Sequence, residues 1–567
     1  MPAQRAGAAR TLVGVDVGST HIKAVLAAPG RGVLHVARRT TDTHYVPGGG
    51  AYHRPAEVLG AVASAIAECV EAAGTGRRPE GIGIASVGES GVPIDRRSRP
   101  VGDMLAWHDS RPDRQAAWLE RQVGAMPLFA RTGLRPEPKY TLPKLLWLRE
   151  QKSADFSRLR RWAGAAELVG LDLTGELATN ASLACRTLAF DVTARTWDAE
   201  LLGLASLEPE VMPRVLPLGT AAGGLTAAAA ARLGLPDGTP VAIAGHDHLV
   251  AALGAGVTRP GDALDSMGGA EAALLVTPQP ALTDETRRCG FSTGCHALDG
   301  LYYVIGGLQS SGALIEWFLE TFLGPASPAA GAGKARARAG RARAPAVAAA
   351  RATAVAAARA SGRVVAAARA TAVGRSRARG RSETVDDDRY ARFLELLERA
   401  GPGPVEPMVR PYLRGRTAPH RDPSASLEFE GIRETDTLAD LAAAVVDGAS
   451  YHVRWMLDEL ARITGTRLDR VRLTGGGARI RRWVAAKAAL GPGRLDVVRT
   501  EEAAALGAAL VAGVACGVYA SVEAALADAS PSDRVTAPAS IRARYDAAYL
   551  DRWLPAVVTR LRQSGLP

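Results

Sequence analysis

A short apolar strand, a turn of small residues and a second apolar strand occur together twice in this chain of 567 residues. The first copy spans Val13–Leu26 with its turn at Asp16–Thr20, and the second spans Ala263–Val276 with its turn at Gly268–Ala270. Short β-type runs on either side of a glycine turn predict hairpins. We therefore expect two domains of related build, with a boundary near residues 255–262.

Helical and strand-like segments alternate after the first hairpin. Apolar residues recur with helical spacing over Ala56–Ala73, whereas Gly81–Ala85 and Val241–Ala244 are compact apolar runs typical of strands. This alternation predicts an α/β fold. Domains usually have about 100–200 residues, so the length also favours more than one domain.

The positive charge of the chain is concentrated in one segment. Residues 325–382 contain twelve Arg, one Lys and no Asp or Glu, a local charge of +13 in a chain whose total is +11, so the remainder carries −2. A nearly neutral body argues against nucleic acid as the partner of the folded part. The pI near 9.7 describes an insert.

This Arg/Ala-rich insert is of low complexity. VAAARATAV occurs at residues 347–355 and again at 365–373, an offset of eighteen residues, or five helical turns. We expect a disordered or partly helical segment. Three origins remain open: a flexible solvated insert, a repeat expansion or frame error in a GC-rich gene, and a polyanion-binding arm.

The five cysteines are odd in number and mostly far apart, so no disulfide framework is expected. Cys289, Cys295 and His296 form a potential metal corner, but no CxxC spacing or fourth ligand accompanies them. Buried or loop thiols are the favoured interpretation.

Two segments bear on membrane insertion or targeting, and neither favours a membrane protein. The first ten residues are too polar for a signal peptide, and we expect a cytoplasmic protein. Ala503–Val522 has no charge over twenty residues, a length that would span a bilayer. Because Ala and Gly dominate it and glutamates flank it, we expect a helix buried between domain layers.

Two motifs place carboxylates next to strand ends. Asp16–Lys23 (DVGSTHIK) joins a carboxylate to a glycine turn, two hydroxyls and a lysine, a set suited to a metal–phosphate ligand, although an ordinary hairpin would look similar. Asp247 follows an apolar strand, where ligands bind in α/β folds. It suits a general base in phosphoryl transfer or a helix N-cap, and both roles can coexist.

A third motif suits a polyol. Trp107, Asp109 and Arg111 are spaced two apart, so on a strand they would share one face, with the indole covering a sugar and the charged groups binding its hydroxyls. A surface strand with an Asp–Arg pair is the alternative. Glu89 adds a carboxylate after another strand.

A glycine loop, Thr474–Gly477, lies between a predicted strand and a predicted helix through Trp483, where backbone can approach a nucleotide closely. The chain contains neither a Walker A motif nor a GxGxxG fingerprint opening a helix, so P-loop and Rossmann folds are not supported.

Taken in order, these motifs resemble those of the FGGY carbohydrate kinases, members of the actin-like and hexokinase-like ATPase superfamily. The resemblance covers nearly the whole chain except the insert. The matching segments are Asp16–Lys23, Trp107–Arg111, Lys144–Trp147, Leu173–Glu176, Gly245–Asp247, Pro411–Gly415, Gly475–Gly477 and Ala505–Ala509.

The resemblance implies two ribonuclease H-like domains with a catalytic cleft between them, and transfer of the γ-phosphoryl group of ATP to a hydroxyl of a ketose, sugar acid or polyol. It implies Asp247 as general base and Asp16 and Asp247 as holders of Mg²⁺ through water. The implied acceptor-binding residues are Glu89, Trp107, Asp109, Arg111 and Asp247. The implied ATP-binding residues are Gly18, Ser19, Thr20, Lys23, Gly268, Gly269, Gly312, Gly475 and Gly476.

Some positions depart from the family pattern. The second phosphate turn is Gly268-Gly269-Ala270 and so lacks the usual hydroxyl, and Trp483-x-Ala485 replaces the usual Trp-x-Gln. Glu89 has the spacing from Asp95 found in glycerol kinases, but Gly88 replaces the neighbouring arginine. A pseudokinase with a regulatory role is therefore the main alternative, and a nucleic-acid-associated protein acting through the insert is another.

We expect residues 1–256 to form the N-terminal domain, with the sugar site, the phosphate hairpin and the catalytic Asp. Residues 257–324 and 383–535 should form the nucleotide-binding domain, interrupted by the insert at 325–382, and residues 536–567 a C-terminal helical tail. The expected cofactors are ATP and Mg²⁺. The expected partner is a small sugar or polyol, with no nucleic acid and no membrane, and a homodimer is left open.

Overall fold

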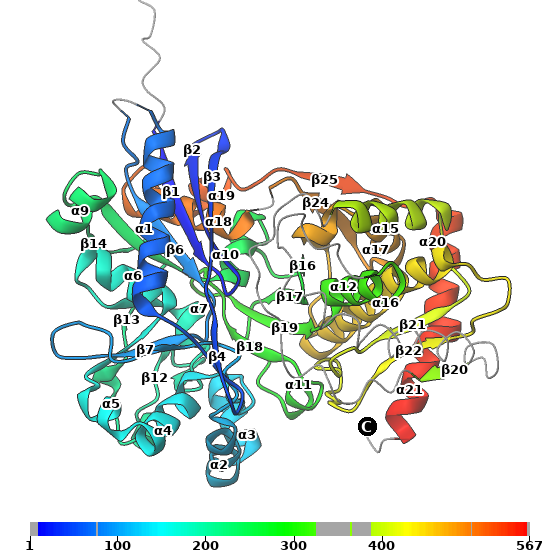
Figure 1. Cartoon of the computed structure of the whole chain (residues 1–567), viewed down its shortest axis with the longest axis horizontal. Coiled ribbons are helices and arrows are strands. Elements are labelled where there is room, and N and C mark those ends of the chain that lie inside the picture. Colours follow the sequence, from blue (N-terminus) through cyan, green and yellow to red (C-terminus); the bar gives the residue numbers. More distant parts are fainter. Residues whose placement is uncertain (1–9, 75–76, 325–362, 366–386, 501, 564–567) are drawn as a thin grey trace, which may run out of the picture.

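Two mixed β-sheets organise the chain into two lobes, seen left and right in Figure 1. The structure is a computed structural model, and it describes residues 10–74, 77–324, 363–365, 387–500 and 502–563. In the first lobe the strand order is β14-β15-β6-β1-β2-β3. These strands are β1 (Leu12–Val17), β2 (His21–Ala28), β3 (Gly32–Thr40), β6 (Ile82–Ser86), β14 (Ala221–Gly224) and β15 (Pro240–His246).

The second lobe contains the order β18-β19-β17-β16-β23-β24-β25. Its strands are β16 (Asp262–Met267), β17 (Glu271–Thr277), β18 (Ser292–Cys295), β19 (Tyr302–Leu308), β23 (Arg470–Thr474), β24 (Arg494–Val498) and β25 (Ser532–Val535).

The two sheets repeat one topology, which confirms the expectation of related domains. In each, an antiparallel hairpin (β1–β2 or β16–β17) continues into a third antiparallel strand (β3 or β19). On its other side, the first hairpin strand pairs in parallel with β6 or β23, which in turn pairs in parallel with β15 or β24. The predicted hairpins and α/β fold are therefore confirmed.

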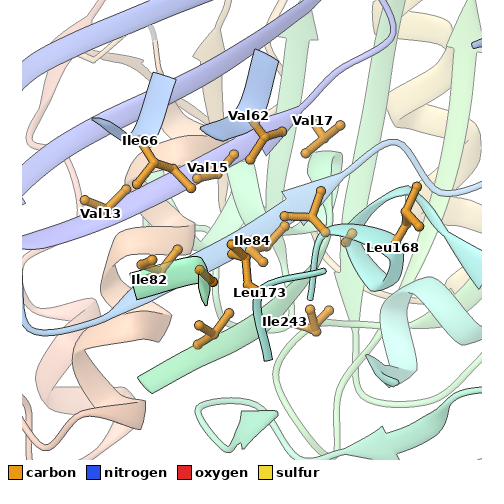
Figure 2. Packing of buried hydrophobic residues seen from close by; sticks show 14 of the residues in the cluster. Val13, Val15, Val17, Val62, Ile66, Ile82, Ile84, Leu168, Leu173 and Ile243 are labelled. Atoms are coloured by element: carbon orange, nitrogen blue, oxygen red, sulfur yellow. The ribbon is translucent and has the colours of Figure 1, made fainter. Parts of the chain in front are cut away.

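One face of the first sheet is covered by α1 (Pro55–Ala72) and α6 (Ala165–Thr174). Figure 2 shows Val13, Val15, Ile82 and Ile84 of the sheet packed with Val62 and Ile66 of α1 and with Leu168 and Leu173 of α6. Alternate residues of β1 and β6 supply this layer because side chains of a strand alternate between its two faces.

The other face of that sheet meets α10 (Asp247–Gly254) and α18 (Ala503–Ala515). A Cβ atom at Gly14 or Gly83 would collide with carbonyl oxygens of α18, and one at Gly254 would collide with the carbonyl of Ala503. Buried residues of α10 and α18 share a hydrophobic core with Leu264 and Leu274 of the second sheet. The alanine-rich segment is thus a helix buried between the layers, as predicted, and it ends at Ala515.

Smaller elements of the first lobe surround this frame. A five-stranded sheet contains β4 (His44–Val46), β5 (Gly50–His53), β7 (Gly91–Ile94), β8 (Met104–Leu105) and β9 (Arg161–Gly164). The two-stranded sheets are β10 (Ala178–Asn180) with β13 (Arg214–Leu216), and β11 (Phe190–Asp191) with β12 (Thr196–Trp197). The helices are α2 (Asp113–Val123), α3 (Ala125–Thr132), α4 (Thr141–Gln151), α5 (Ser153–Arg158), α7 (Ala181–Ala184), α8 (Ala199–Gly203), η1 (Pro209–Val211) and α9 (Ala227–Leu233).

In the second lobe, α16 (Leu438–Thr464) is the long central helix, seen in yellow-orange in Figure 1. Around it lie α11 (Asp284–Arg288), α12 (Ser311–Phe322), α15 (Asp387–Arg399), η2 (Gly476–Arg479) and α17 (Arg481–Leu490). The short helix α19 (Val522–Leu526) packs instead against α18. The chain ends in α20 (Ala539–Ala547), the π-helix η3 (Ala548–Trp553) and α21 (Leu554–Gln563). Tyr545 and Trp553 are buried against α16, so these helices pack onto the second lobe.

Most of the Arg/Ala-rich insert lies outside the described residues. Its described piece, β20 (Arg363–Val365), is a strand that pairs antiparallel with β22 (Leu427–Glu430), which also pairs with β21 (Met408–Pro411). The two copies of the repeat, at 347–355 and 365–373, lie outside the described residues except for Val365. All five cysteines are free, and within the described ranges no helix is long and apolar enough to cross a membrane.

Gly83→Ala should lower the free energy of unfolding by about 3 kcal/mol, because the added methyl group forces α18 away from β6. Chemical denaturation of the full chain measures this. Gly60→Ala is the matched control, since Gly60 lies on α1 with no atom within 4 Å of an added Cβ. It should stabilise by about 0.5–1 kcal/mol. Equal effects of the two substitutions would contradict backbone-level packing of α18.

Candidate functional site

The carboxyl ends of β1, β6 and β15 lie at one edge of the first sheet because these strands are parallel neighbours. Asp16 occupies the end of β1, Glu89 follows β6, and Asp247 follows β15. Three carboxylates separated by up to 231 positions are thereby brought to the same edge. Ligands bind at this edge in open α/β sheets.

The Asp16 carboxylate forms no ion pair with any described residue. Its Oδ1 is buried and accepts no hydrogen bond from any residue described. Burial, with the charge of Asp247 adding to it, raises the pKa of Asp16 to about 7. Lys23, its register partner on β2, places its Nζ 2.9 Å from Oε2 of Glu502, which also pairs with Arg38. The lysine of the predicted phosphate motif is thus bound to a residue just before α18.

The turn Gly18–Thr20 connects β1 to β2. The Gly18 N–H donates to the carbonyl of His21 at 3.1 Å, and the Thr41 hydroxyl donates to the carbonyl of Gly18 at 2.8 Å. Ser19 is half-buried and Thr20 is exposed, which leaves their hydroxyls available at the edge.

Asp247 is the first residue of α10, and His246 is the N-cap, so the predicted N-cap role of Asp247 is wrong. Its Oδ1 accepts the backbone N–H of His248 at 2.7 Å and lies 3.3 Å from Nε2 of His246. A quarter of the side chain is exposed. Burial of the rest raises the pKa of Asp247 to about 7, so the carboxylate can take up a proton near neutral pH.

A β-bulge in β15 orients the segment that carries Asp247. The register of β15 against β6 shifts between Ile243 and Gly245, and Gly245 has φ +129°. A Cβ at Gly245 would collide with Oγ of Ser182, which accepts the N–H of His246 at 3.0 Å. A bulge re-aims the side chains that follow it, and here it turns the chain from β15 into α10.

Glu89 is paired with Arg186, a residue that sequence analysis missed. The guanidinium of Arg186 donates to Oε1 of Glu89 at 2.5 and 2.9 Å, and both side chains are buried. Burial would raise the pKa of Glu89, but Arg186 outweighs it and lowers that pKa to about 2. Arg186 also donates to the hydroxyl of Tyr303 in the second lobe at 3.4 Å.

Gly88 makes room for this pair. A Cβ at Gly88 would lie 3.0 Å from Cγ of Arg186 and 2.8 Å from Cδ2 of His246. The cation beside Glu89 thus comes from a segment 97 positions away in the chain. Burial, with Arg186 adding to it, lowers the pKa of His246 well below its usual value, so this imidazole is neutral.

The predicted strand through Trp107, Asp109 and Arg111 is wrong. These residues form a turn after β8, because Ala106 and Asp109 close it with a backbone hydrogen bond of 3.1 Å. Arg111 makes a bidentate pair with buried Asp109 and lies 4.4 Å above the ring of Trp147. Trp107 stays 37% exposed and available to a ligand.

Lys144 fastens this turn to the Glu89 segment. Its buried ammonium donates to the carbonyls of Glu89 at 2.6 Å and Ala106 at 2.9 Å. Burial lowers the pKa of Lys144 to about 7. The lysine therefore positions backbone segments that carry the predicted acceptor residues.

Glycines converge at the matching edge of the second sheet. A Cβ at Gly475 would lie 2.7 Å from the carbonyl of Met267, and one at Gly312 would lie 2.6 Å from the carbonyl of Gly268. The N–H groups of Gly312 and Ala313 donate to the carbonyls of Gly268 and Gly269 at 3.2 and 3.0 Å. The predicted nucleotide glycines thus lie together, and Gly475 adopts φ +88°.

Two of these glycines line open space. An added Cβ at Gly269 would meet no atom within 4 Å, and one at Gly476 would meet only the end of Arg479 at 3.9 Å. Backbone N–H groups in such turns can bind phosphate oxygens. Ala270 leaves this turn without a hydroxyl, as the sequence indicated.

A buried lysine, also missed by sequence analysis, connects the elements of this edge. Nζ of Lys487 on α17 lies 2.6 Å from carboxylate oxygens of both Asp265 on β16 and Glu271 on β17. Glu271 in turn accepts the hydroxyl of Ser311, next to Gly312, at 2.6 Å. Burial raises the pKa of Glu271 to about 8 despite the lysine.

The chemistry of the two edges fits a divalent cation and a nucleotide. The unpartnered Oδ1 of Asp16 and the partly exposed carboxylate of Asp247 are hard oxygen donors, which Mg²⁺ prefers. The close-packed glycines at the second edge leave no side chain between backbone and ligand.

Comparison with known proteins gave matches along the chain. A family model described as the FGGY family of carbohydrate kinases, N-terminal domain, matches residues 11–254, and the C-terminal domain of that family matches residues 265–516. The xylulose kinase of Staphylococcus xylosus is 22% identical over 74% of both chains. The gluconokinase of Bacillus subtilis is 22% identical over 90% of this chain and 87% of its own.

The fold has matches of the same kind. The crystal structure of xylulose kinase from Rhodospirillum rubrum superposes with a TM-score of 0.78 at 24% identity, over 98% of this chain and 99% of the other. Two α/β lobes in this arrangement are therefore shared.

Lys487→Met should lower the free energy of unfolding by about 3–5 kcal/mol, because it leaves Asp265 and Glu271 buried without their cation. Because burial raises the pKa of Glu271 to about 8, this carboxyl ionises more between about pH 6 and about pH 8, so the loss should be larger at the higher pH. Denaturant unfolding at both pH values measures it. Arg499→Met, which breaks an exposed pair with Asp533, should change stability far less. Equal losses would contradict the role of Lys487.

Proposed function

Since this chain belongs to the FGGY family of carbohydrate kinases, we propose that it transfers the γ-phosphoryl group of MgATP to a hydroxyl of a neutral sugar or polyol, with Asp247 as the general base. Kinases of this family use ATP. The single observation that carries the assignment of the base is the position of Asp247, partly exposed at the strand edge that also holds Asp16 and Glu89, with its pKa raised to about 7.

The proposed reaction is a direct displacement. Asp247 accepts the proton of the acceptor hydroxyl while that oxygen forms a bond to the γ-phosphorus, and the bond between the γ-phosphorus and the β,γ-bridging oxygen of ATP breaks. The products are a phosphorylated acceptor and ADP. His246 beside Asp247 is neutral and so does not form an ion pair with the Asp247 carboxylate. That carboxylate can therefore accept the proton of the acceptor hydroxyl.

We assign Asp16 and Asp247 to Mg²⁺, held through water. When bound, Mg²⁺ supplies charge neutralisation of the phosphates. Gly18, Ser19, Thr20, Lys23, Gly268 and Gly269 are proposed to lie along the phosphates, and Gly312, Gly475 and Gly476 against the nucleoside. Support for the second group comes from the close approach of Gly312 to the carbonyl of Gly268 and of Gly475 to the carbonyl of Met267, the residue before Gly268.

Glu89, Trp107, Asp109 and Arg111 are proposed to bind the acceptor together with Asp247. The charges favour a neutral acceptor. Arg186 pairs with Glu89 at 2.5 Å and Arg111 pairs with Asp109 at 2.5 Å. Lys139 and Arg135 share Glu137, at 2.6 and 3.4 Å. A sugar acid would bring a carboxylate to cations that are already paired, whereas a ketose or polyol needs only hydrogen bonds.

Asp247→Asn should reduce kcat by at least about 100-fold, because general-base catalysis contributes about 10²–10⁴-fold. A coupled ADP-release assay with MgATP and a panel of pentuloses, hexuloses, aldonates, pentitols and glycerol measures this. In the wild-type protein kcat/KM should rise about tenfold per pH unit below about pH 7 and then level off, since the base must be ionised.

Three controls accompany this assay. Asp533→Asn, in an exposed pair with Arg499, should keep wild-type turnover. Because its pKa is raised on folding, ionised Asp247 costs stability as the pH rises from about 4 to about 7, so Asp247→Asn should melt no lower than wild type at about pH 8. Chelation of Mg²⁺ should abolish turnover, and Asp16→Asn should raise the Mg²⁺ concentration required for turnover.

More than a tenth of wild-type turnover in Asp247→Asn would refute the assignment of Asp247 as the general base.

Arg186→Met should raise KM for the acceptor by at least about tenfold while KM for ATP changes less than about twofold, since it leaves Glu89 without its cation. Steady-state kinetics with the best acceptor measures both constants. Arg232→Met, in an exposed pair with Asp172, is the matched control. For the wild type, kcat/KM should be at least about tenfold higher for ketoses or polyols than for aldonates. A preference for aldonates would overturn the neutral acceptor but not the kinase.

A further inference from the structure

Three metal-binding side chains of different chemistry meet in the second lobe, apart from the residues assigned above. Cys289 follows α11, His420 lies in the connection between β21 and β22, and Glu459 lies on α16. One ligand atom of each lies within 4.8 Å of the other two, and Sγ of Cys289 is 3.9 Å from Nε2 of His420. Within the described residues this is the only group of three such ligands.

Cys289 alone among the three residues of the potential metal corner in the sequence belongs to this group, and the other two have different contacts. Cys295 Sγ instead contacts the carbonyl of Val192 at 3.7 Å, and Nδ1 of His296 accepts the N–H of Leu298 at 3.0 Å. The partners of Cys289 are 131 and 170 positions away in the chain. Sequence spacing could not have indicated them.

The backbone holds the cysteine and the histidine together. The N–H of His420 donates to the carbonyl of Cys289 at 2.7 Å, and Nε of Arg416 donates to the carbonyl of His420 at 2.7 Å. The imidazole stacks on Trp455, one turn before Glu459 on α16, with ring centres 5.9 Å apart and planes 25° apart. The three ligands are therefore positioned before any ion arrives.

The charges around the group balance. Glu459 pairs with Arg462 at 2.7 Å, and Arg462 also pairs with Glu285 at 2.7 Å. Burial lowers the pKa of His420, Glu459 opposes this, and Arg416 adds to the lowering. Burial raises the pKa of the Cys289 thiol to about 12, so this side chain is a thiol until an ion replaces its proton.

We propose that Cys289, His420 and Glu459 bind a thiophilic divalent metal ion such as Zn²⁺, through one sulfur, one nitrogen and one oxygen. Zn–S distances near 2.3 Å and Zn–N distances near 2.0–2.1 Å place tetrahedral S and N ligands about 3.5 Å apart, so a shift of a few tenths of an ångström from 3.9 Å is sufficient. Binding releases the thiol proton. Three protein ligands leave a fourth position for water.

Such an ion would tie the β21–β22 connection to α11 and α16. The proposal is independent of the kinase assignment, because Mg²⁺ prefers all-oxygen ligands whereas a thiolate selects softer ions. The two sites are therefore distinguishable by the metal they take.

Co²⁺ is the probe, used with untagged full-length protein that has been stripped with a chelator and dialysed. Titration should produce a near-ultraviolet thiolate-to-cobalt charge-transfer band that saturates at about one equivalent. An equal concentration of Zn²⁺ should remove the band, because Zn²⁺ binds such sites more tightly than Co²⁺, and a large excess of Mg²⁺ should leave it.

Cys289→Ser should eliminate the band, and His420→Gln and Glu459→Gln should each weaken Co²⁺ binding by at least about tenfold. Cys516→Ser is the matched control, since this thiol is more exposed than Cys289 and lies outside the group. It should keep the full band. If Cys289→Ser fails to fold, His420→Gln, at a half-buried position, decides the matter.

No saturable band in the wild type, or a band that survives in Cys289→Ser, would overturn the proposal. So would an unchanged Co²⁺ affinity in His420→Gln. Kinase turnover, measured in separate samples with Mg²⁺ as the sole metal, shows whether the proposed function holds whatever the cobalt result.

Discussion

The contact of α18 with the first sheet is the constraint on which the rest depends. Gly14 and Gly83 let the helix backbone rest on β1 and β6, and Gly254 lets α10 approach α18 equally closely. The same two helices share a core with the second sheet. Because α10 begins at Asp247 and α18 follows Glu502, this packing also decides where the proposed general base and the partner of Lys23 lie.

The carboxylates at the two sheet edges occur in two kinds of setting. Glu89 and Asp265 each have a cation within 2.6 Å, from Arg186 and Lys487. Asp16 and Asp247 have no such neighbour at hydrogen-bonding distance, and burial raises the pKa of both to about 7. Paired groups hold structure, and the uncompensated ones supply the proton and metal chemistry proposed for the site.

Local signals predicted much of the fold. The glycine turns at Asp16–Thr20 and Gly268–Ala270 set the two hairpins, and the Ala/Gly content of Ala503–Ala515 indicated a buried helix. Predictions failed where neighbours distant in sequence decide the conformation. Trp107–Arg111 has strand-like spacing but forms a turn, because the Asp109–Arg111 pair and Lys144 hold it there. Arg186 and Lys487 were missed because a lone basic residue carries no local signal.

The sequence by itself determined the kinds of elements and their order, because apolar periodicity and glycine turns act over a few residues. It also determined which residue types were available for chemistry. The tertiary structure decided which of them meet. Parallel strand pairing brought Asp16 and Asp247 to one edge of the first sheet. Packing of segments far apart in the sequence brought Arg186 to Glu89 and His420 to Cys289. Such contacts depend on the packing of whole elements, which no short segment encodes.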